Sequence, residues 1–284
     1  MICLLLILSV LCATWLLASC EKTPEFSPSD GATSGVDPAS GASDPSGASG
    51  SSGASDPSGA SDPSGGTADP AEKARILAEW QSKYTAGGFG IVDPSNPFVV
   101  MEIEGYGSIR LELFPSYAPI SVENFLKYVN DGFYDGVVFH RVIKNFMIQA
   151  GGFVESEGVV TSKNATYGEI KGEFVDNGVA NYIGHFPGIL SMARKGKQED
   201  AQGNVIDDGY DSGSSEFFIC STRAYWLDGQ YAAFGRVIDE ESMDVVYAIE
   251  KVETTTRYLY YGSTPARAGD VPVSLPRITR AYAI

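Results

Sequence analysis

The run Phe139–Gly152, with the sequence FHRVIKNFMIQAGG, gathers one cation, several large apolar groups and an amide on a short segment. Arg141 carries a guanidinium that stays charged and offers several hydrogen-bond donors in a rigid fork. Phe146 and Met147 supply an apolar wall, and Gln149 places an amide beside it. A permanent cation next to a dry wall suits chemistry on a neutral, partly apolar group. It does not suit a site that needs a nucleophile or a metal.

Residue types that supply a nucleophile or bind a metal are few in this chain. His140 and His185 are the 2 histidines, which leaves little support for histidine-based metal binding or proton transfer. His140 stands beside Arg141, and we expect it to be a hydrogen-bonded structural residue. Cys220 ends an apolar run, so we expect a buried strand thiol that acts as a small hydrophobic group. The sequence predicts no metal and no cofactor.

The overall composition excludes several classes of partner. The chain has 284 residues, enough for one or two domains, and a net charge of −16 at pH 7. Residues 1–20 contain no charged side chain, so this charge belongs to the rest of the chain. An acidic surface repels phosphate backbones and anionic lipid. We therefore expect no nucleic-acid partner and no electrostatic docking on a membrane.

Residues 1–20 are mostly Leu, Ile, Val and Ala, which is typical of an export segment. The end of this segment, Leu17–Cys20, resembles the processing site of bacterial lipoproteins, in which Cys20 becomes the lipidated first residue. The alternative is an uncleaved membrane anchor, because the run approaches the ~20 apolar residues that span a bilayer. With Cys220 as the one free thiol of the mature chain, no internal disulfide forms. We expect a lipid-anchored protein of the bacterial cell envelope, facing the periplasm or the exterior.

Residues 21–68 predict a disordered tether. The unit Gly-Ala-Ser-Asp-Pro-Ser recurs, for example at 41–46 and 53–58, and it offers almost nothing that folding could bury. A flexible chain of about 50 residues spans about 40 Å, which is enough to hold a domain clear of a membrane.

Residues 69–96 predict a helix followed by a linker. Asp69-Pro70-Ala71-Glu72 combines an N-cap, a proline in the first turn and a capping-box glutamate. Apolar residues from Ala74 to Tyr84 follow at helical spacing, and Gly87-Gly88 ends the segment. This apolar stripe either packs on the domain that follows or binds a partner.

The pattern over residues 97–284 is that of a mainly β domain. Apolar and polar residues alternate over 99–103 and 109–113 around a glycine-containing turn. This alternation predicts a hairpin with one face in solvent.

Two helices and a final strand complete the expected domain. Helical spacing of apolar residues predicts a helix over Pro119–Asn130 and another from about Glu240 to Val252. Alternation over Arg277–Ile284 predicts a closing strand. Helices among many short strands favour a barrel whose ends the helices cover, since closure removes exposed strand edges.

A series of short motifs runs through this domain, namely Glu123-Asn124-Phe125, Phe139–Gly152, Gly188–Ala193, Ser215–Ile219, Trp226–Gly229 and Phe234-Gly235. In this order they resemble the motifs of the cyclophilins, the peptidyl-prolyl cis/trans isomerases. The resemblance covers roughly residues 97–284 and is closest to the bacterial branch over residues 170–194. It implies a closed eight-stranded antiparallel barrel capped by two helices, here preceded by an extra N-terminal helix.

The resemblance also implies a mechanism, with Arg141 as the catalytic residue. Rotation about an X–Pro bond is slow because amide resonance must be broken. In the twisted transition state the proline nitrogen becomes pyramidal and gains a lone pair. A fixed donor aimed at that nitrogen stabilises the twisted amide more than the planar one, which is the difference that catalysis requires.

The remaining groove residues are likewise implied by the resemblance. The proline ring would occupy an apolar pocket, while Gln149 would hold the substrate backbone and Trp226 would contact cyclosporin-type inhibitors. We expect a monomer that assists the folding of exported, proline-containing polypeptides. The substrate-binding residues implied are Ile143, Phe146, Met147, Gln149, Ala193, Glu216, Phe218, Trp226, Leu227 and Tyr231.

Three groove positions depart from the common cyclophilin pattern. Tyr231 stands where many members have His, and it still offers a hydroxyl. Arg194 replaces a common Asn and changes the charge of the groove. Glu216 replaces a usual Gln, and we expect it to pair with Arg141 or Arg194 and to favour basic or neutral residues beside the proline.

Two stretches are extra relative to the family pattern. Residues 195–212 form an insertion rich in Asp and Glu, which favours a solvated acidic loop over a Ca²⁺ site because the spacing does not fit an EF-hand. The stretch Tyr258–Gly269 contains tyrosines that form an exposed aromatic patch or pack inside. The insertion and Glu216 favour an alternative function, a proline-peptide binding or scaffold module with weak turnover. A mere structural spacer would leave the groove residues unexplained.

Overall fold

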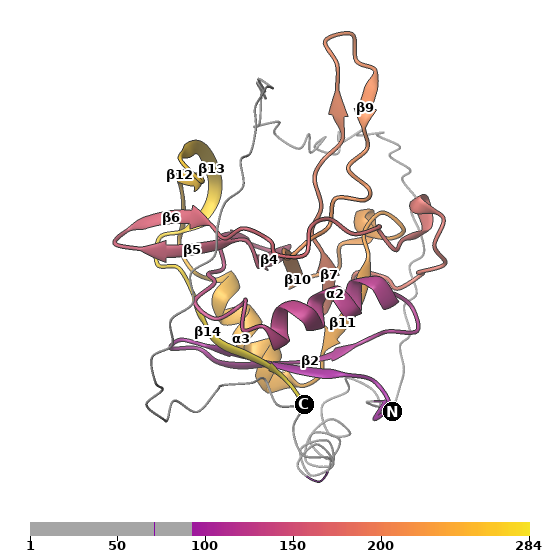
Figure 1. Cartoon of the computed structure of the whole chain (residues 1–284). Coiled ribbons are helices and arrows are strands. Elements are labelled where there is room, and N and C mark those ends of the chain that lie inside the picture. The colour runs from indigo at the N-terminus through magenta and orange to yellow at the C-terminus, as the bar shows by residue number, and fades with distance from the viewer. Residues whose placement is uncertain (1–70, 72–92) are drawn as a thin grey trace, which may run out of the picture. The chain divides into compact units, whose positions relative to one another are not determined.

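One eight-stranded sheet dominates the computed structural model, which describes Ala71 and residues 93–284 (Figure 1). Its strand order is β14-β1-β2-β11-β7-β10-β4-β3, and every neighbouring pair is antiparallel. The predicted mainly β fold class is confirmed. The strands are β1 (Phe98–Ile103), β2 (Gly107–Leu113), β3 (Arg141–Ile143), β4 (Met147–Ala150), β7 (Ile189–Met192), β10 (Phe217–Cys220), β11 (Ala233–Val237) and β14 (Ile278–Ala283).

Several sequence predictions lie outside the described residues. These are the export segment 1–20 with Cys20, the tether 21–68 and the helix expected to start at Asp69, of which Ala71 alone is described and is helical. In the described part of the chain, no helix has the length and apolar character needed to cross a bilayer.

The β1–β2 hairpin forms where the alternation predicted it. Val99 pairs with Leu111 and Met101 with Ile109, and these four side chains lie fully buried in the main core. Gly105 takes a φ of 75° in the turn between the strands, a left-handed conformation that glycine adopts without steric cost.

The prediction that one face of this hairpin lies in solvent was wrong at Glu112. This residue is buried. Its carboxylate accepts hydrogen bonds from Asp93 N at 3.0 Å and from Asn96 Nδ2 at 2.9 Å, and pairs with Arg236 Nε at 2.9 Å. A buried carboxylate is tolerated here because these partners satisfy it. The strand pattern alone gave no sign of partners so distant in sequence.

The end strands β14 and β3 are not paired to each other as strands. The segment that precedes β3 links them instead. Ile278 N donates to Val137 O at 2.8 Å, and Phe139 N donates to Pro276 O at 2.9 Å. The chain then passes directly into β3, so the start of the run Phe139–Gly152 is tied to the last strand.

The predicted helices are confirmed as α2 (Pro119–Asn130) and α3 (Glu240–Glu250), which pack against the curved sheet (Figure 1). Phe125 of α2 contributes to an aromatic core, with its ring 5.5 Å from Phe217 and 5.2 Å from Phe234. Val246 and Ile249 of α3 are fully buried. Asp239 caps α3 by accepting a hydrogen bond from Ser242 N at 2.7 Å.

A second sheet of four strands was not predicted, and it contains the stretch expected at Tyr258–Gly269. Tyr258 and Tyr261 are exposed, whereas Leu259 is buried against Phe153 and its neighbours. The stretch is therefore part of a hairpin with one wet and one packed face. The strands, in the order β13-β12-β6-β5, are β5 (Phe153–Ser156), β6 (Val159–Ser162), β12 (Thr254–Tyr261) and β13 (Thr264–Pro272).

The insertion 195–212 is a small hairpin and not the expected loop. Strands β8 (Gln198–Glu199) and β9 (Val205–Asp207) pair and extend away from the main sheet (Figure 1). Asp200 closes the turn between them by accepting hydrogen bonds from Gln202 N at 2.9 Å and Asn204 N at 2.8 Å. Across the residues that the structure describes, no cluster of acidic, histidine or cysteine side chains has a metal-binding arrangement.

Candidate active site

The β3–β4 hairpin places Arg141 and Gln149 side by side. They are register partners, and Arg141 Nη1 donates a hydrogen bond to Gln149 Oε1 at 3.2 Å. Phe218 of β10 is the register partner of Gln149 on its other side. Three neighbouring strands therefore bring a guanidinium, an amide and an aromatic ring to one end of the sheet.

Phe146 is positioned by a tight turn between β3 and β4. Asn145 in this turn has a φ of 58°, which Asn tolerates better than most residues. Its N–H donates to Glu250 Oε1 at 2.6 Å, and the same oxygen accepts from Ser221 Oγ at 2.6 Å. A carboxylate is unfavourable at a helix C-terminus, so its place at the end of α3 is explained by these two contacts.

The predicted apolar pocket residues lie in one cluster. Its buried members include Cys220, whose predicted role as a buried strand thiol is confirmed. Burial raises the pKa of this thiol to about 12, so it stays protonated. The buried members are Met147, Phe218, Cys220, Ala224 and Leu227, and Ile143, Phe146, Ala193 and Tyr231 pack against them.

Trp226 forms one border of this cluster. Its ring lies 5.3 Å from the Phe146 ring, and the residue is partly exposed to solvent. Tyr231 borders the cluster elsewhere, with its ring edge-on to Phe218 at 5.8 Å. The groove is thus an apolar pocket with aromatic rims, and the hydrogen-bonded pair of Arg141 and Gln149 stands beside it.

Glu216 extends the polar side of the groove into a chain of four groups. Gln149 Nε2 donates to Glu216 Oε2 at 2.8 Å, and His140 Nε2 lies 3.4 Å from the same oxygen. Arg141, Gln149, Glu216 and His140 therefore follow one another through contacts between their side chains. His140 is buried, as expected of a structural residue, but among the described residues its Nδ1 has no hydrogen-bond partner.

The predicted pairing of Glu216 with Arg141 or Arg194 was wrong, because Gln149 stands between Glu216 and Arg141. Burial acts to raise the pKa of Glu216. The charge and hydrogen bond of His140, the hydrogen bond from Gln149 and the nearby charge of Arg141 outweigh it and hold the pKa below its ordinary value. The carboxylate therefore stays ionised at neutral pH.

Comparison with known proteins agrees with this geometry. Residues 98–280 match the family model described as cyclophilin type peptidyl-prolyl cis-trans isomerase/CLD, and this span is well over half of the chain. The chain belongs to the cyclophilin-type peptidyl-prolyl cis-trans isomerases. The enzyme class predicted from the sequence is confirmed.

Curated relatives of this cyclophilin include two bacterial proteins. A peptidyl-prolyl cis-trans isomerase of Acinetobacter baylyi is 41% identical over 155 residues, which cover 53% of this chain and 70% of that protein. Peptidyl-prolyl cis-trans isomerase A of Dickeya dadantii is 40% identical over 153 residues, covering 52% and 68% respectively. A solved cyclophilin-type isomerase of Cryptosporidium parvum aligns at 24% identity and a TM-score of 0.48, over 66% of this chain and 98% of its own.

Two glycines at the end of the run Phe139–Gly152 allow Glu216 to lie against it in this cyclophilin domain. A Cβ on Gly151 would come within 2.3 Å of Ser215 O, and one on Gly152 within 2.2 Å of Glu216 Oε1. Gly151 also has a φ of 105°, which side-chain-bearing residues rarely adopt. Gly151 and Gly152 are therefore required for the close approach of Ser215 and Glu216, which precede β10.

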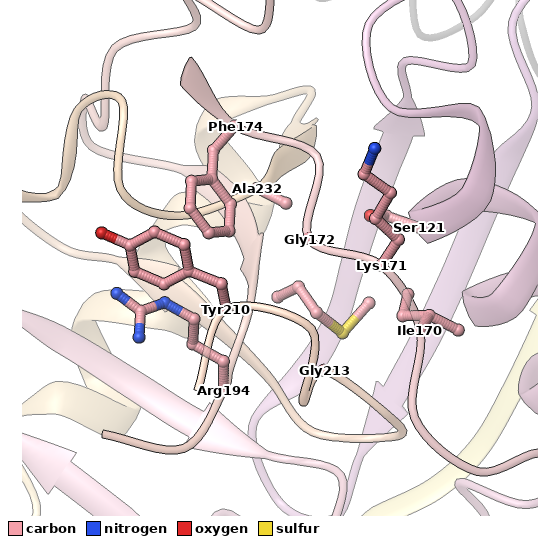
Figure 2. Close-up of a pocket in the computed structure, with 10 residues that line it drawn as sticks. Ser121, Ile170, Lys171, Gly172, Phe174, Arg194, Tyr210, Gly213 and Ala232 are labelled. Atoms are coloured by element: carbon pink, nitrogen blue, oxygen red, sulfur yellow. The ribbon is translucent and has the colours of Figure 1, made fainter. Parts of the chain in front are cut away.

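Arg194 does not point its charge freely into the groove of this cyclophilin. Its guanidinium carbon lies over three rings, at 4.4 Å from Tyr231, 5.0 Å from Tyr210 and 5.5 Å from Phe174. Figure 2 shows Arg194 with Tyr210 and Phe174 around a small pocket at the base of the insertion. Tyr231 also packs on the groove cluster, so Arg194 lies at the border between this pocket and the groove.

A buried polar network supports the floor of the groove. His185 lies stacked on Phe218, with Nε2 3.1 Å from Ser191 Oγ and Nδ1 3.1 Å from Asp228 Oδ1. Ser191 is fully buried, so this serine, histidine and aspartate hold the pocket and do not meet a substrate. The hydrogen bond from Arg223 lowers the pKa of Asp228 to about 2, against the effect of burial.

The structure brings all the sequence-predicted groove residues to one place, and it adds others that were missed. The contact of His140 with Glu216 and the anchoring of the Asn145 turn by Glu250 were not foreseen. Asn145, between an apolar strand and Phe146, was a turn signal that the sequence did carry. Nothing local in the sequence pointed to Glu250, which lies 105 positions further along the chain.

Proposed function

We propose that this cyclophilin isomerises X–Pro bonds by donating a hydrogen bond from Arg141 to the proline nitrogen as the amide twists. The planar amide has no lone pair on that nitrogen to accept the bond, whereas the twisted amide does. The contact is therefore stronger in the transition state than in the bound substrate. The apolar cluster around Phe218 would hold the proline ring, and Gln149 would hold the backbone beside it.

This proposal rests on one observation: other side chains use few of the hydrogen-bond donors of the Arg141 guanidinium. Among the described residues the guanidinium makes one side-chain hydrogen bond, to Gln149, and no carboxylate forms an ion pair with it. An arginine offers five donors, so most remain for a bound amide. Gln149 stands between the cation and Glu216, so the acid does not neutralise Arg141 by direct contact.

The free donors of Arg141 also weigh against the alternative function, a binding module with weak turnover. That alternative was favoured by the presence of Glu216 in the sequence. The full-length protein should accelerate the exchange of a prolyl tetrapeptide between its cis and trans forms, measured by NMR exchange spectroscopy. Acceleration at catalytic protein concentrations supports the enzyme. Binding of the peptide without any acceleration would establish the binding module instead.

Cyclosporin should compete with the peptide in this experiment. The apolar cluster and the partly exposed Trp226 offer the kind of surface that a large apolar ring requires. Loss of acceleration at stoichiometric cyclosporin would place the inhibitor in the same groove as the proline.

We further propose that the enzyme acts in the bacterial cell envelope on exported polypeptides, held by a lipid on Cys20. Support comes from the apolar segment 1–20, the small residues before Cys20 and the tether that follows. Labelling with radioactive palmitate in cells tests this, because Cys20→Ala should abolish the label. A wild-type chain that carries no label and stays in the membrane would favour an uncleaved anchor.

A further inference from the structure

Phe186, Tyr225 and Trp226 form an exposed aromatic shelf beside the proline groove. Their exposed fractions are 56%, 70% and 48%. An aromatic side chain buries about 150–250 Å² when it is fully covered, so these rings leave a large apolar area in water. The Tyr225 and Trp226 rings lie 5.3 Å apart, and exposed apolar surface that gathers in this way marks binding sites.

Hydrogen bonds hold together the two segments that form the shelf. Ala224 N donates to His185 O at 2.9 Å, and His185 N donates to Asp228 Oδ1 at 2.7 Å. These bonds join the segment that carries Phe186 to the segment that carries Tyr225. The guanidinium of Arg223 lies 4.4 Å from the centre of the Phe186 ring and braces it.

The shelf is continuous with the groove. The Trp226 ring lies 5.3 Å from the Phe146 ring, which belongs to the groove, and 5.3 Å from the Tyr225 ring, which does not. In the same segment Ala224 and Leu227 are buried in the groove cluster. This short turn therefore sends two residues into the groove and two rings outward.

The charge of the shelf is balanced although the chain as a whole is acidic. Arg223 forms an ion pair with Asp228, so the cation beside Phe186 is neutralised locally. A neutral aromatic surface suits an aromatic or large aliphatic side chain better than a charged one. Unfolded polypeptides expose such side chains, whereas folded ones bury them.

We infer that the aromatic shelf binds an apolar side chain of the same polypeptide whose proline occupies the groove, and so selects unfolded segments. This inference rests on the proposed function for the position of the proline. The shelf adds affinity for a side chain a few residues from the proline. It plays no part in the twisting of the amide.

Binding of two synthetic decapeptides to the full-length protein tests the shelf, measured by calorimetry. Each peptide contains one proline. One peptide has Trp three residues before and three residues after the proline, and the other has Ser at both positions. We expect the wild type to prefer the Trp peptide by about 10-fold and the double variant F186S/Y225S to lose this preference, since two ring contacts are worth about that factor. Turnover of a prolyl tetrapeptide should be unchanged in the double variant. Tyr258→Ser removes an equally exposed tyrosine from β12 and should retain the preference.

Each result decides the matter. An equal preference in the wild type and in F186S/Y225S overturns the shelf, and leaves the proposed catalysis standing if the tetrapeptide is still turned over. A wild type that prefers the Trp peptide but turns over no tetrapeptide overturns the proposed catalysis and not the shelf. A double variant that loses self-association, with no change in peptide affinity, would assign the shelf to a second copy of the chain and overturn the inference.

Discussion

Gln149 Nε2 donates a 2.8 Å hydrogen bond to Glu216 Oε2, and this contact fixes which way the Gln149 amide faces. A carboxylate can only accept, so the amide NH₂ must point to Glu216. The amide oxygen then points to Arg141 and accepts its 3.2 Å hydrogen bond. With a glutamine at position 216, either end of the Gln149 amide could face Arg141. Glu216 thus positions the donor for catalysis without touching it.

The first prediction concerns Glu216→Gln. We expect kcat/KM for a prolyl peptide to fall by about 3- to 10-fold, because the charge-assisted hydrogen bond that holds the amide in one orientation becomes a weaker neutral one, a difference of about 1 kcal/mol. Glu169→Gln removes the same charge from an exposed residue paired with Lys195, and it should leave kcat/KM unchanged. An equal loss in both variants would show a general charge effect and no orienting role.

The pH dependence of kcat/KM gives a second test of the role of Glu216. The pKa of Glu216 lies below its ordinary value of 4.5, so the carboxylate persists as the pH falls past that value. A carboxylate with a lowered pKa contributes its stabilisation above its unfolded pKa and loses it as the pH falls through the folded pKa. Wild-type kcat/KM should therefore hold to about pH 4.5 and decline below it. If Glu216→Gln shows the same decline, another group is responsible.

The second prediction concerns Glu173, which caps α2 from a distant part of the chain. Its carboxylate accepts from Ile120 N at 3.0 Å and from Ser121 N at 2.7 Å, where the N-cap Ala118 has no side chain to do so. Glu173→Ala should lower the free energy of unfolding by about 2 kcal/mol, since it leaves the buried N–H of Ser121 and the partly buried N–H of Ile120 unpaired.

Denaturant titration measures this loss, and Glu123→Ala supplies the matched control. Glu123 is an exposed carboxylate on the same helix, paired with Lys127 four residues on. Its removal should leave the free energy of unfolding close to the wild-type value, because an exposed ion pair on a helix contributes little. Equal losses at both positions would contradict the capping role.

The third prediction concerns Glu250, which anchors the Asn145 turn and hence Phe146. Glu250→Ala leaves the Asn145 N–H and the Ser221 hydroxyl without their acceptor. We expect peptide affinity to fall by about 3- to 10-fold as the Phe146 side of the groove loosens. The measurement is calorimetric, with Glu253→Ala, an exposed carboxylate just beyond the helix, as the control. Unchanged affinity in Glu250→Ala would show that the Asn145 turn does not hold the groove in shape.

Local patterns in the sequence were enough to predict the elements that carry the groove. The hairpin at Phe98–Leu113, helix Pro119–Asn130 and the helix starting at Glu240 all follow from alternation and helical spacing that act over a few positions. The groove residues came from motifs whose neighbours in space are set by the family fold. Their meeting in one cluster needed no feature peculiar to this chain.

Contacts between residues far apart in the sequence could not be predicted from local patterns. Glu112 is buried because Arg236, 124 positions away, reaches it. Glu216 meets Gln149 across 67 positions, which a pattern of charges cannot reveal. The β12–β13 hairpin was different, since the run of β-branched and aromatic residues before Gly262 did signal a strand and a turn.

The central claim is that Arg141 acts on the twisted amide and not on the bound substrate. The most direct measurement is NMR exchange spectroscopy on a prolyl peptide with the full-length wild type and Arg141→Ala, combined with calorimetric peptide Kd values. We predict that kcat/KM falls by about 100- to 1000-fold in the variant while Kd changes by less than about 3-fold, as expected for a donor used only in the transition state. A Kd that weakens in proportion to kcat/KM, or a variant as fast as the wild type, would contradict the account.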